Sequence, residues 1–204
     1  MKNKIIISFF LFVITGMIAQ KNKGILYFKD GKTEKGLIKI IDNDILFKKT
    51  KKEKRIIYNH QKIDSVRYLD MKNISRKFEY INLKNTSEPI LASLKVDGSL
   101  KLYKTVRNKS EYIEPNDKNQ DNDWNDYKYA LKVDRPTATF YLQRTTEQFA
   151  TFFINFNGTK RKKFEKVITD YFEDCKSIID KVKKKKFKMK HYREIVEYYN
   201  TECK

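Results

Sequence analysis

The sequence predicts an α+β protein in which an antiparallel β-rich body precedes a C-terminal helical segment. Up to residue 157, short apolar runs alternate with turn residues, which is typical of strands. From residue 158 onward, apolar residues recur at steps of three and four, which is typical of amphipathic helices. Strands first and helices last favour α+β over an alternating βαβ layout. We therefore expect a leader at residues 1–19, the body at 20–157 and the helical segment at 158–204.

The first residues have the layout of a secretory signal peptide. Lys2 and Lys4 form a positive head, and the 14 residues from Ile5 to Ile18 are almost wholly apolar. Because a spanning helix needs about 20 apolar residues, this block favours a cleaved leader, with an uncleaved anchor as the alternative. Small Ala19 before polar Gln20 predicts cleavage after residue 19. The mature chain is expected to be exported to the periplasm, the outer-membrane surface or the medium, and to lack a transmembrane span.

The N-terminal part of the body is expected to be a meander of short strands joined by tight turns. Asp30-Gly31 is a strong hairpin signal, because both central residues of a type I′ turn need a positive φ. Asp42-Asn43-Asp44 marks the next turn. The strands predicted around these turns are Gly24–Lys29, Gly36–Ile41, Ile45–Lys48, Arg55–Tyr58 and Ile63–Leu69.

The second part of the body alternates more cleanly between apolar and polar residues. Asp97-Gly98 predicts a hairpin whose second strand turns Leu100 and Leu102 to one face and Tyr103 to the other. Leu94 and Val96 are expected opposite Leu100 and Leu102 across this turn. Residues 108–126 are polar and turn-rich, and are expected to form a long loop. The predicted strands are Phe78–Leu83, Ile90–Val96, Leu100–Val106, Tyr127–Val133, Thr137–Arg144 and Phe149–Phe156, of which the last also fits a helix.

Three helices are predicted, because the apolar residues of each segment fall on one helical face. The first face carries Phe164, Val167, Ile168, Tyr171 and Phe172, the second Ile178, Ile179 and Val182, and the third Tyr192, Ile195, Val196 and Tyr199. Thr159 is the expected N-cap of the first helix.

The two cysteines, Cys175 and Cys203, are expected to form a disulfide. Export makes a disulfide permissible. Cys175 lies just before the second predicted helix and Cys203 just after the third, so antiparallel helices would bring them together. The alternative is two unpaired thiols.

The charge of the chain points to an anionic partner. The formal net charge is +19, and removing Lys2 and Lys4 with the leader leaves +17. Such a charge attracts nucleic acid, anionic lipid and acidic polysaccharide, but export argues against intracellular nucleic acid. The alternative is a solvated surface that reflects AT-rich codon usage, because Lys, Asn, Ile and Tyr are all abundant.

Two basic clusters are candidate polyanion-binding sites. Aromatic residues lie close to both in the sequence, and basic residues interleaved with aromatic ones can hold anionic strands or sugars. The alternative is a solvated hairpin tip and a solvated helix end. The cluster residues are Lys51, Lys52, Lys54 and Arg55 in the first, and Lys183, Lys184, Lys185 and Lys186 in the second.

The polar loop contains a candidate calcium site. Oxygen-bearing residues stand at every second position, as a Ca²⁺ loop requires: Asp117, Asn119, Asp121 and Asp123. Asn122 stands where an EF-hand needs Gly, and Lys128 where it needs Glu. The alternative is a solvated loop, and no other cofactor is predicted.

No local catalytic motif is present. The sequence has two histidines, His60 and His191, and contains no HExxH, GxSxG, P-loop or GxGxxG pattern. A catalytic site would therefore have to assemble from distant residues.

Two segments resemble known proteins. The opening GILYFKDGKTEKGLIKI, with DILFKK and IDSVRYL, resembles the strand–Asp-Gly–strand meander of small SH3-like or Sm-like barrels. The RNA-reading residues of Sm proteins have no counterpart here. The end of the chain resembles the C-terminus of small secreted proteins of unknown function from Gram-negative bacteria, in which YF-x-D-C precedes a helical hairpin ending in YN-x-x-C. The matching residues are Tyr171, Phe172, Asp174, Cys175, Tyr199, Asn200 and Cys203, and the resemblance implies no activity.

The sequence therefore predicts an exported, non-enzymatic protein that binds another protein or an anionic component of the cell envelope. One alternative is a hydrolase whose site assembles in space. The other is a binding module stabilised by Ca²⁺.

Overall fold

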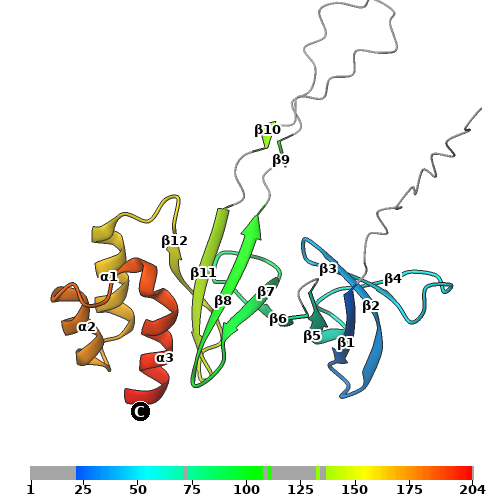
Figure 1. The fold of residues 1–204 in the computed structure, drawn as a ribbon, viewed down its shortest axis with the longest axis horizontal. Helices are drawn as coiled ribbons and strands as arrows, with labels where there is room; N and C mark the ends of the chain where they lie inside the picture. Colours follow the sequence, from blue (N-terminus) through cyan, green and yellow to red (C-terminus); the bar gives the residue numbers. More distant parts are fainter. Residues whose placement is uncertain (1–21, 71–72, 108–109, 112–131, 134–136, 204) are drawn as a thin grey trace, which may run out of the picture.

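The protein is built on one long antiparallel sheet with three helices at one end, as the computed structural model shows (Figure 1). The structure describes residues 22–70, 73–107, 110–111, 132–133 and 137–203. Within these residues, ten strands pair in the order β12-β11-β8-β7-β6-β5-β1-β2-β3-β4. The strands of this sheet are β1 Asn22–Phe28, β2 Thr33–Ile41, β3 Asp44–Lys48, β4 Ile56–Tyr58, β5 Ile63–Leu69, β6 Ser75–Ile81, β7 Ile90–Val96, β8 Leu100–Arg107, β11 Thr137–Arg144 and β12 Thr151–Asn155. The α+β class with a β-rich body and a helical C-terminus is confirmed.

The remaining elements are a short ribbon and the helical segment. Strands β9, Ser110–Glu111, and β10, Lys132–Val133, pair with each other outside the main sheet. Of the predicted strand at 127–133, the structure describes the last two residues, which form β10. The expected leader and the expected calcium loop lie outside the described residues. The helices are α1 Arg161–Tyr171, α2 Lys176–Lys183 and α3 Tyr192–Glu202, with a 3₁₀ turn at Met189–His191 before α3.

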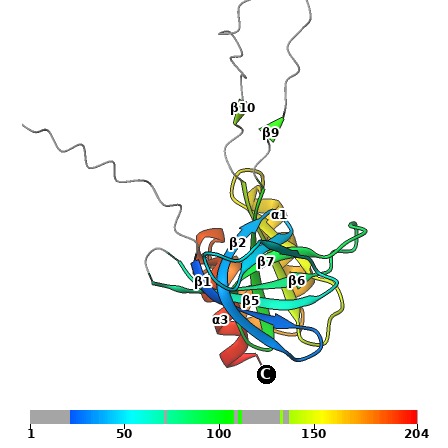
Figure 2. The same cartoon turned by 90° about the vertical axis from the view of Figure 1, so that its right-hand side faces the viewer.

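Strands β1 to β5 curl into a lobe around a first core, to which β6 and β7 also contribute side chains. Figure 2 looks along the molecule from this lobe, with the helices behind it. Turns stand where the sequence predicts them: Gly31 has φ of 84° after β1, and Asp42 has φ of 51° between β2 and β3. The first turn is not of type I′, because Asp30 lacks the positive φ that both central residues of that type need. The meander of short strands is therefore confirmed, whereas the likeness to SH3-like or Sm-like barrels stays a prediction. The buried side chains of this first core are Leu26, Ile38, Ile45, Phe47, Ile63, Val66 and Leu91.

The helices cover the opposite end of the sheet and enclose a second core. Helix α3 packs on β7 and β8, α1 packs on β12, and α2 packs on both of these helices (Figure 1). Phe153 and Phe172 are fully buried at its centre, where their rings lie 6.4 Å apart. Leu100 and Leu102 point into this core, as the alternation in β8 predicts.

Both cores lie on the same face of the sheet. Directly paired residues of antiparallel strands project to the same face, and one such row crosses the sheet from the first core to the second. Its members are, in order, Leu26, Val66, Phe78, Ser93, Lys104, Phe140 and Ile154. The middle of this row belongs to neither core, so a strip of polar and basic residues separates the two. A third, smaller core around Tyr103 and Ile81 occupies the opposite face.

A bulge in β7 corrects one expectation from the sequence. Strict alternation would place Leu94 and Val96 on one face. The register shifts between these residues, so that Leu94 pairs with Tyr103 and Val96 pairs with Leu102. An extra residue in one strand reverses the facing of the residues beyond it. Leu94 therefore packs against the third core, and Val96 packs into the second.

Two further expectations are wrong in detail. Strand β6 begins at Ser75 rather than Phe78, because a turn in which Ile74 N–H donates to the Asp70 carboxylate aligns Ser75 with Leu69. Thr159 does not cap α1. Its hydroxyl accepts a hydrogen bond from Asn155 N–H at 2.8 Å, which ties the helix entry back to β12, and Lys160 occupies the N-cap position.

Candidate functional site

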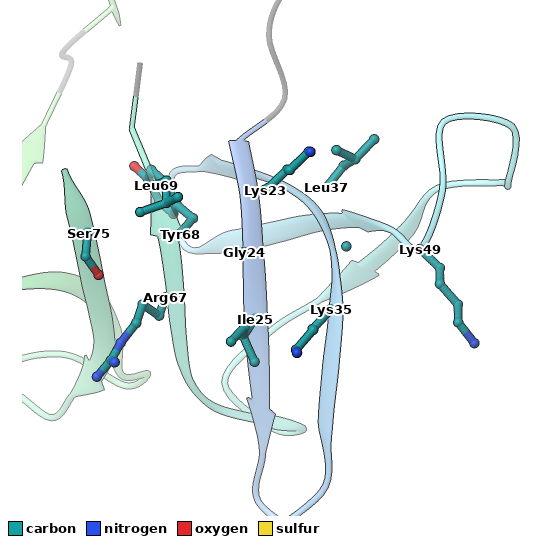
Figure 3. Close-up of a pocket in the computed structure, with 11 residues that line it drawn as sticks. Lys23, Gly24, Ile25, Lys35, Leu37, Lys49, Arg67, Tyr68, Leu69 and Ser75 are labelled. Atoms are coloured by element: carbon teal, nitrogen blue, oxygen red, sulfur yellow. The ribbon is translucent and has the colours of Figure 1, made fainter. Parts of the chain in front are cut away.

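A groove on the outer face of the N-terminal lobe is the candidate functional site. It has a volume of about 530 Å³ and lies on β1, β2 and β5, on the face opposite the first core (Figure 3). Alternation along the strands explains this placement: Ile25 and Leu37 face the groove, whereas Leu26 and Ile38 point into the core. The lining residues are Lys23, Gly24, Ile25, Lys35, Gly36, Leu37, Lys49, Arg67, Tyr68, Leu69 and Ser75.

Two paired glycines form the floor of the groove. Gly24 of β1 lies directly opposite Gly36 of β2, and a Cβ on either would point toward the core. At Gly24 that Cβ would lie 2.7 Å from the side chain of Ile38, and at Gly36 it would lie 2.5 Å from the ring of Phe47. Glycine permits this close approach of core side chains to the strands. The glycines therefore let the lobe curl tightly beneath the groove.

The walls of the groove combine cations with apolar side chains. In the strand register, Lys23 pairs with Leu37, and Ile25 pairs with Lys35, so each cation stands beside an aliphatic side chain. Figure 3 shows these two pairs on either side of Gly24. Leu69 adds an apolar side chain that is 46% exposed. The groove thus offers an apolar surface within reach of several positive charges.

The positive charge of the groove is not neutralised within the part of the chain that the structure describes. Lys23, Lys35, Lys49 and Arg67 are all exposed, and the lining contains no Asp or Glu. None of the four forms an ion pair with a described carboxylate, although such pairs occur elsewhere, as between Arg76 and Asp70. Positive side chains gathered without counter-charges create a potential that favours anions.

The predicted basic clusters lie outside this groove. Lys51, Lys52, Lys54 and Arg55 are exposed in the connection between β3 and β4, just beyond Lys49 of the groove. The second cluster, Lys183, Lys184, Lys185 and Lys186, is exposed at the end of α2, at the far end of the molecule (Figure 1). The fold does not bring the two clusters together. Their role in binding a polyanion stays a prediction.

The predicted disulfide is present in the structure. Cys175 and Cys203 are bonded, with their Cα atoms 5.5 Å apart. Cys175 stands at the N-cap of α2 and Cys203 at the C-cap of α3, as the argument from antiparallel helices required. A bonded pair of which Cys175 is buried is consistent with an exported protein.

The described residues give no support to a metal site or to a hydrolytic site. No group of three or more His, Cys, Asp or Glu side chains is placed to hold a metal ion in the described part of the chain. The predicted calcium ligands Asp117, Asn119, Asp121 and Asp123 lie outside it. His60 packs edge-on against the ring of Tyr80, and His191 Nδ1 accepts a hydrogen bond from Lys188 N–H. Neither histidine is hydrogen-bonded to a described carboxylate or hydroxyl.

The motif at the end of the chain builds a polar network rather than a cleft. Arg144, at the end of β11, donates to the carboxylates of Glu147 and Asp174 at 3.0 Å and to the carbonyl oxygen of Tyr171 at 2.6 Å. Its guanidinium also lies over the rings of Tyr171 and Tyr199. Burial, reinforced by its hydrogen bond to Glu147, raises the pKa of Tyr171, so this phenol stays a neutral donor. The network fastens α1 and α3 to the sheet.

Asn200 belongs to the YN-x-x-C part of the C-terminal motif. Its side chain makes the hydrogen bonds to the start of β8 that a neighbouring strand would otherwise make. Its Oδ1 accepts hydrogen bonds from Leu100 N–H at 2.8 Å and from the Ser99 hydroxyl at 2.9 Å, and its Nδ2 donates to the Leu100 carbonyl at 2.9 Å. A Cβ on Gly98 would lie 2.5 Å from Asn200 Nδ2, so the Asp-Gly turn and Asn200 require each other. The motif residues therefore have a structural role.

Sequence reasoning missed the groove, although a signal was present. The tripeptides Lys23-Gly24-Ile25 and Lys35-Gly36-Leu37 repeat a Lys-Gly-aliphatic pattern in two neighbouring strands. In an antiparallel hairpin whose turn lies midway between the two glycines, they fall opposite each other. The repeat thus predicts a glycine floor flanked by two Lys–aliphatic pairs.

Comparison of the chain with protein-family models, curated proteins and solved structures finds no match. The resemblance to small secreted proteins of unknown function therefore stays a prediction. None of the helices in the described residues has the length and apolar character needed to cross a membrane.

Proposed function

We propose that the protein is an exported, non-enzymatic protein that binds an anionic, amphipathic component of the cell envelope through the groove on β1, β2 and β5. The observation that carries this proposal is the composition of the groove. Four exposed cations surround Ile25, Leu37 and Leu69 without a carboxylate among the lining residues. An acidic lipid or glycolipid presents the complementary chemistry, because its charged headgroup adjoins an apolar part.

The groove fits this class of ligand better than a purely polar polyanion. A nucleic acid or acidic polysaccharide is held chiefly by charge and leaves exposed aliphatic side chains unused. Complete burial of an exposed aliphatic side chain by a ligand contributes about 1.5–3 kcal/mol to the free energy of binding. Leu69 and Leu37 therefore supply an affinity that survives when salt screens the cations.

Export is part of the same proposal. The leader lies outside the described residues, and the disulfide is what supports an oxidising destination. Mass spectrometry of the native product is expected to show an N-terminus at Gln20 and two fewer hydrogens than the dithiol. An intact Met1 with two free thiols would contradict the exported location.

Vesicle flotation tests the binding surface. We expect the purified protein to float with phosphatidylglycerol vesicles and not with phosphatidylcholine vesicles. Binding should weaken from 0.05 M to 0.5 M salt, because the Debye length falls from about 14 Å to about 4 Å. The double variant Lys35→Glu/Arg67→Glu should lose most of the binding at low salt. Leu37→Ser/Leu69→Ser should lose the part that persists at high salt.

A matched control separates the groove from general basicity. Lys52→Glu/Lys54→Glu makes the same change of net charge in the exposed connection between β3 and β4, outside the groove. This variant should keep most of the binding. Equal losses in the two charge-reversed variants would show that net charge, or the Lys51–Arg55 cluster, governs binding, and the groove assignment would then be wrong.

A further inference from the structure

A basic seam lies between the two cores, on the opposite face of the sheet from the groove. It consists of Arg76, Ser93, Lys95 and Lys104 of the sheet and Arg193 of α3. Ser93 pairs with Phe78 on one side and with Lys104 on the other, so these side chains stand side by side on the face that the helices cover. Lys95 is the extra residue of the bulge in β7, between Leu94 and Val96. The charges of Lys104 on β8 and Arg193 on α3 act on it, which places it on the face that α3 covers.

Lys95 is the unusual member of this seam. It is half-buried at the bulge of β7, and it makes no ion pair or side-chain hydrogen bond with a described residue. Burial lowers the pKa of Lys95, and the positive charges of Arg76, Lys104 and Arg193 lower it further. An ammonium group that is partly removed from water among like charges destabilises the fold unless a counter-charge is present.

The neighbouring carboxylates do not provide this counter-charge. Asp70 binds Arg76 at 2.8 Å, and Glu197 binds Arg193 at 2.8 Å within α3. These pairs hold the two guanidinium groups at the ends of the seam, whereas Lys95 and Lys104 have no described acidic partner. The seam therefore carries an excess of at least two positive charges at one place.

The seam also contains a free hydroxyl group. Ser93 is 7% exposed, and its Oγ makes no hydrogen bond with a described residue. Every fully buried oxygen or nitrogen of the described side chains has a hydrogen-bond partner. Because Ser93 Oγ has no such partner, it must be accessible to solvent. A hydroxyl beside lysine side chains can donate a charge-assisted hydrogen bond to an anionic oxygen that they bind.

An aromatic wall borders the seam on the side of the N-terminal lobe. The rings of Tyr68 and Phe78 stack with their centroids 5.5 Å apart and their planes 15° from parallel. Phe78 is the direct strand neighbour of Ser93. The stack limits the seam on that side and offers an apolar surface to the group that carries an anion.

We propose that the basic seam is a binding site for a phosphate group, held by Lys95, Lys104 and the Ser93 hydroxyl and flanked by Arg76 and Arg193. A phosphate dianion supplies the two negative charges that the seam lacks, and its oxygens accept bonds from several donors at once, which a single carboxylate does less well. The phosphate is either free or carried by a lipid headgroup. The site is independent of the groove.

Thermal unfolding and NMR test the seam with inorganic phosphate as the probe. Phosphate at 10 mM should raise the Tm above that in sodium chloride of equal ionic strength, because a ligand that binds only the folded state stabilises it. The Lys95 side-chain resonance should shift on addition of phosphate, and its pKa should rise. In Lys95→Met the same rise in Tm should require at least about ten-fold more phosphate, since one charged contact is worth about 1.5 kcal/mol or more.

Lys84→Met is the matched control, because Lys84 is exposed in the connection between β6 and β7 and its replacement makes the same change of charge. This variant should respond to phosphate as the wild type does. Lys95→Met is itself expected to fold with undiminished stability, since it removes an unpaired cation. A phosphate response that is absent in the wild type, or that persists in Lys95→Met/Lys104→Met, would overturn the proposal.

Vesicles that contain phosphatidate, whose headgroup is a phosphate monoester, distinguish the two sources. If flotation with phosphatidate is lost in Lys95→Met while Lys35→Glu/Arg67→Glu retains it, the seam binds a lipid phosphate. If the Tm shift by inorganic phosphate depends on Lys95 and flotation does not, the seam binds free phosphate. Dependence of both responses on the groove residues alone would show that the seam is not a phosphate site.

Discussion

Replacement of Asn200 and Gly98, alone and together, tests the claim that the end of the chain fastens β8. Asn200→Ala removes the three hydrogen bonds to Ser99 and Leu100. Leu100 is fully buried, so water does not replace these partners. Leaving a buried polar group unpaired costs about 1–3 kcal/mol. We therefore expect the free energy of unfolding to fall by about 2–4 kcal/mol.

Gly98→Ala should cost at least as much, by displacing the same side chain. Its Cβ would lie 2.5 Å from Asn200 Nδ2 and 2.6 Å from Asn200 Cγ, so the amide must leave its position. The φ of 155° adds about 1 kcal/mol of backbone strain for a non-glycine residue. In the double variant the collision is absent, and the same hydrogen bonds are lost only once. The double variant should thus be more stable than the sum of the single effects predicts, by about 2 kcal/mol.

Urea unfolding followed by far-UV circular dichroism measures all four free energies, by linear extrapolation to water. Thr201→Ala is the control, because the exposed Thr201 hydroxyl bonds only to carbonyl groups of its own helix. It should change stability by less than about 0.5 kcal/mol. If the effects of Gly98→Ala and Asn200→Ala add to within about 0.5 kcal/mol, the two residues do not depend on each other and the reasoning fails.

Three further predictions concern the disulfide, a partly buried carboxylate and the glycine floor. Cys175→Ser/Cys203→Ser should lower the free energy of unfolding by about 3–4 kcal/mol, the chain-entropy value for a crosslink with a sequence separation of 28, and a loss below about 1 kcal/mol in urea unfolding would contradict it. Burial alone would raise the pKa of Glu79, but hydrogen bonds from Lys77 and Tyr103 and the charge of Lys101 hold this pKa below its ordinary value of 4.5. The Glu79 carboxylate therefore stabilises the fold at any pH above its pKa in the unfolded state. This stabilisation is lost as the pH falls through its pKa in the folded state. Glu79→Gln should flatten the fall of stability in acid, and an unchanged pH profile would count against it. Gly36→Ala should lower the free energy of unfolding by more than about 2 kcal/mol, because its Cβ collides with the ring of Phe47. Gly31→Ala, whose Cβ meets nothing within 4 Å, should lower it by about 1 kcal/mol through the strain of its φ of 84°. Equal losses would refute the steric explanation.

The sequence alone was sufficient to predict the strands, helices and disulfide, because these depend on local chemistry. The strands follow from turn residues such as Asp30-Gly31, whose conformation is set by two adjacent residues. The helices follow from apolar spacing, and the disulfide follows from the position of each cysteine at a helix end. Each of these inferences needs only neighbours in the chain or one simple packing rule.

The sites depend on register, which local patterns do not determine. The seam joins Arg76, Lys95 and Arg193, whose proximity requires the order of β6, β7 and β8 and the placement of α3. The bulge in β7 reverses the facing of Val96 through a backbone irregularity that no residue type announces. Thr159 has the composition of an N-cap, but its hydroxyl bonds to Asn155 instead. The residues of the seam thus became visible only when strand pairing was known.

Because Asn200 and Cys203 stand at the end of α3, about a hundred residues after the hairpin that Asn200 binds, the helical half cannot become stable before α3 has been synthesised. A nascent polypeptide can already pair β1 through β5, whose partners are all close in sequence. The hairpin at Gly98, by contrast, waits for a residue synthesised a hundred positions later. A product truncated before Asn200 should therefore carry a folded N-terminal lobe and a protease-sensitive C-terminal half.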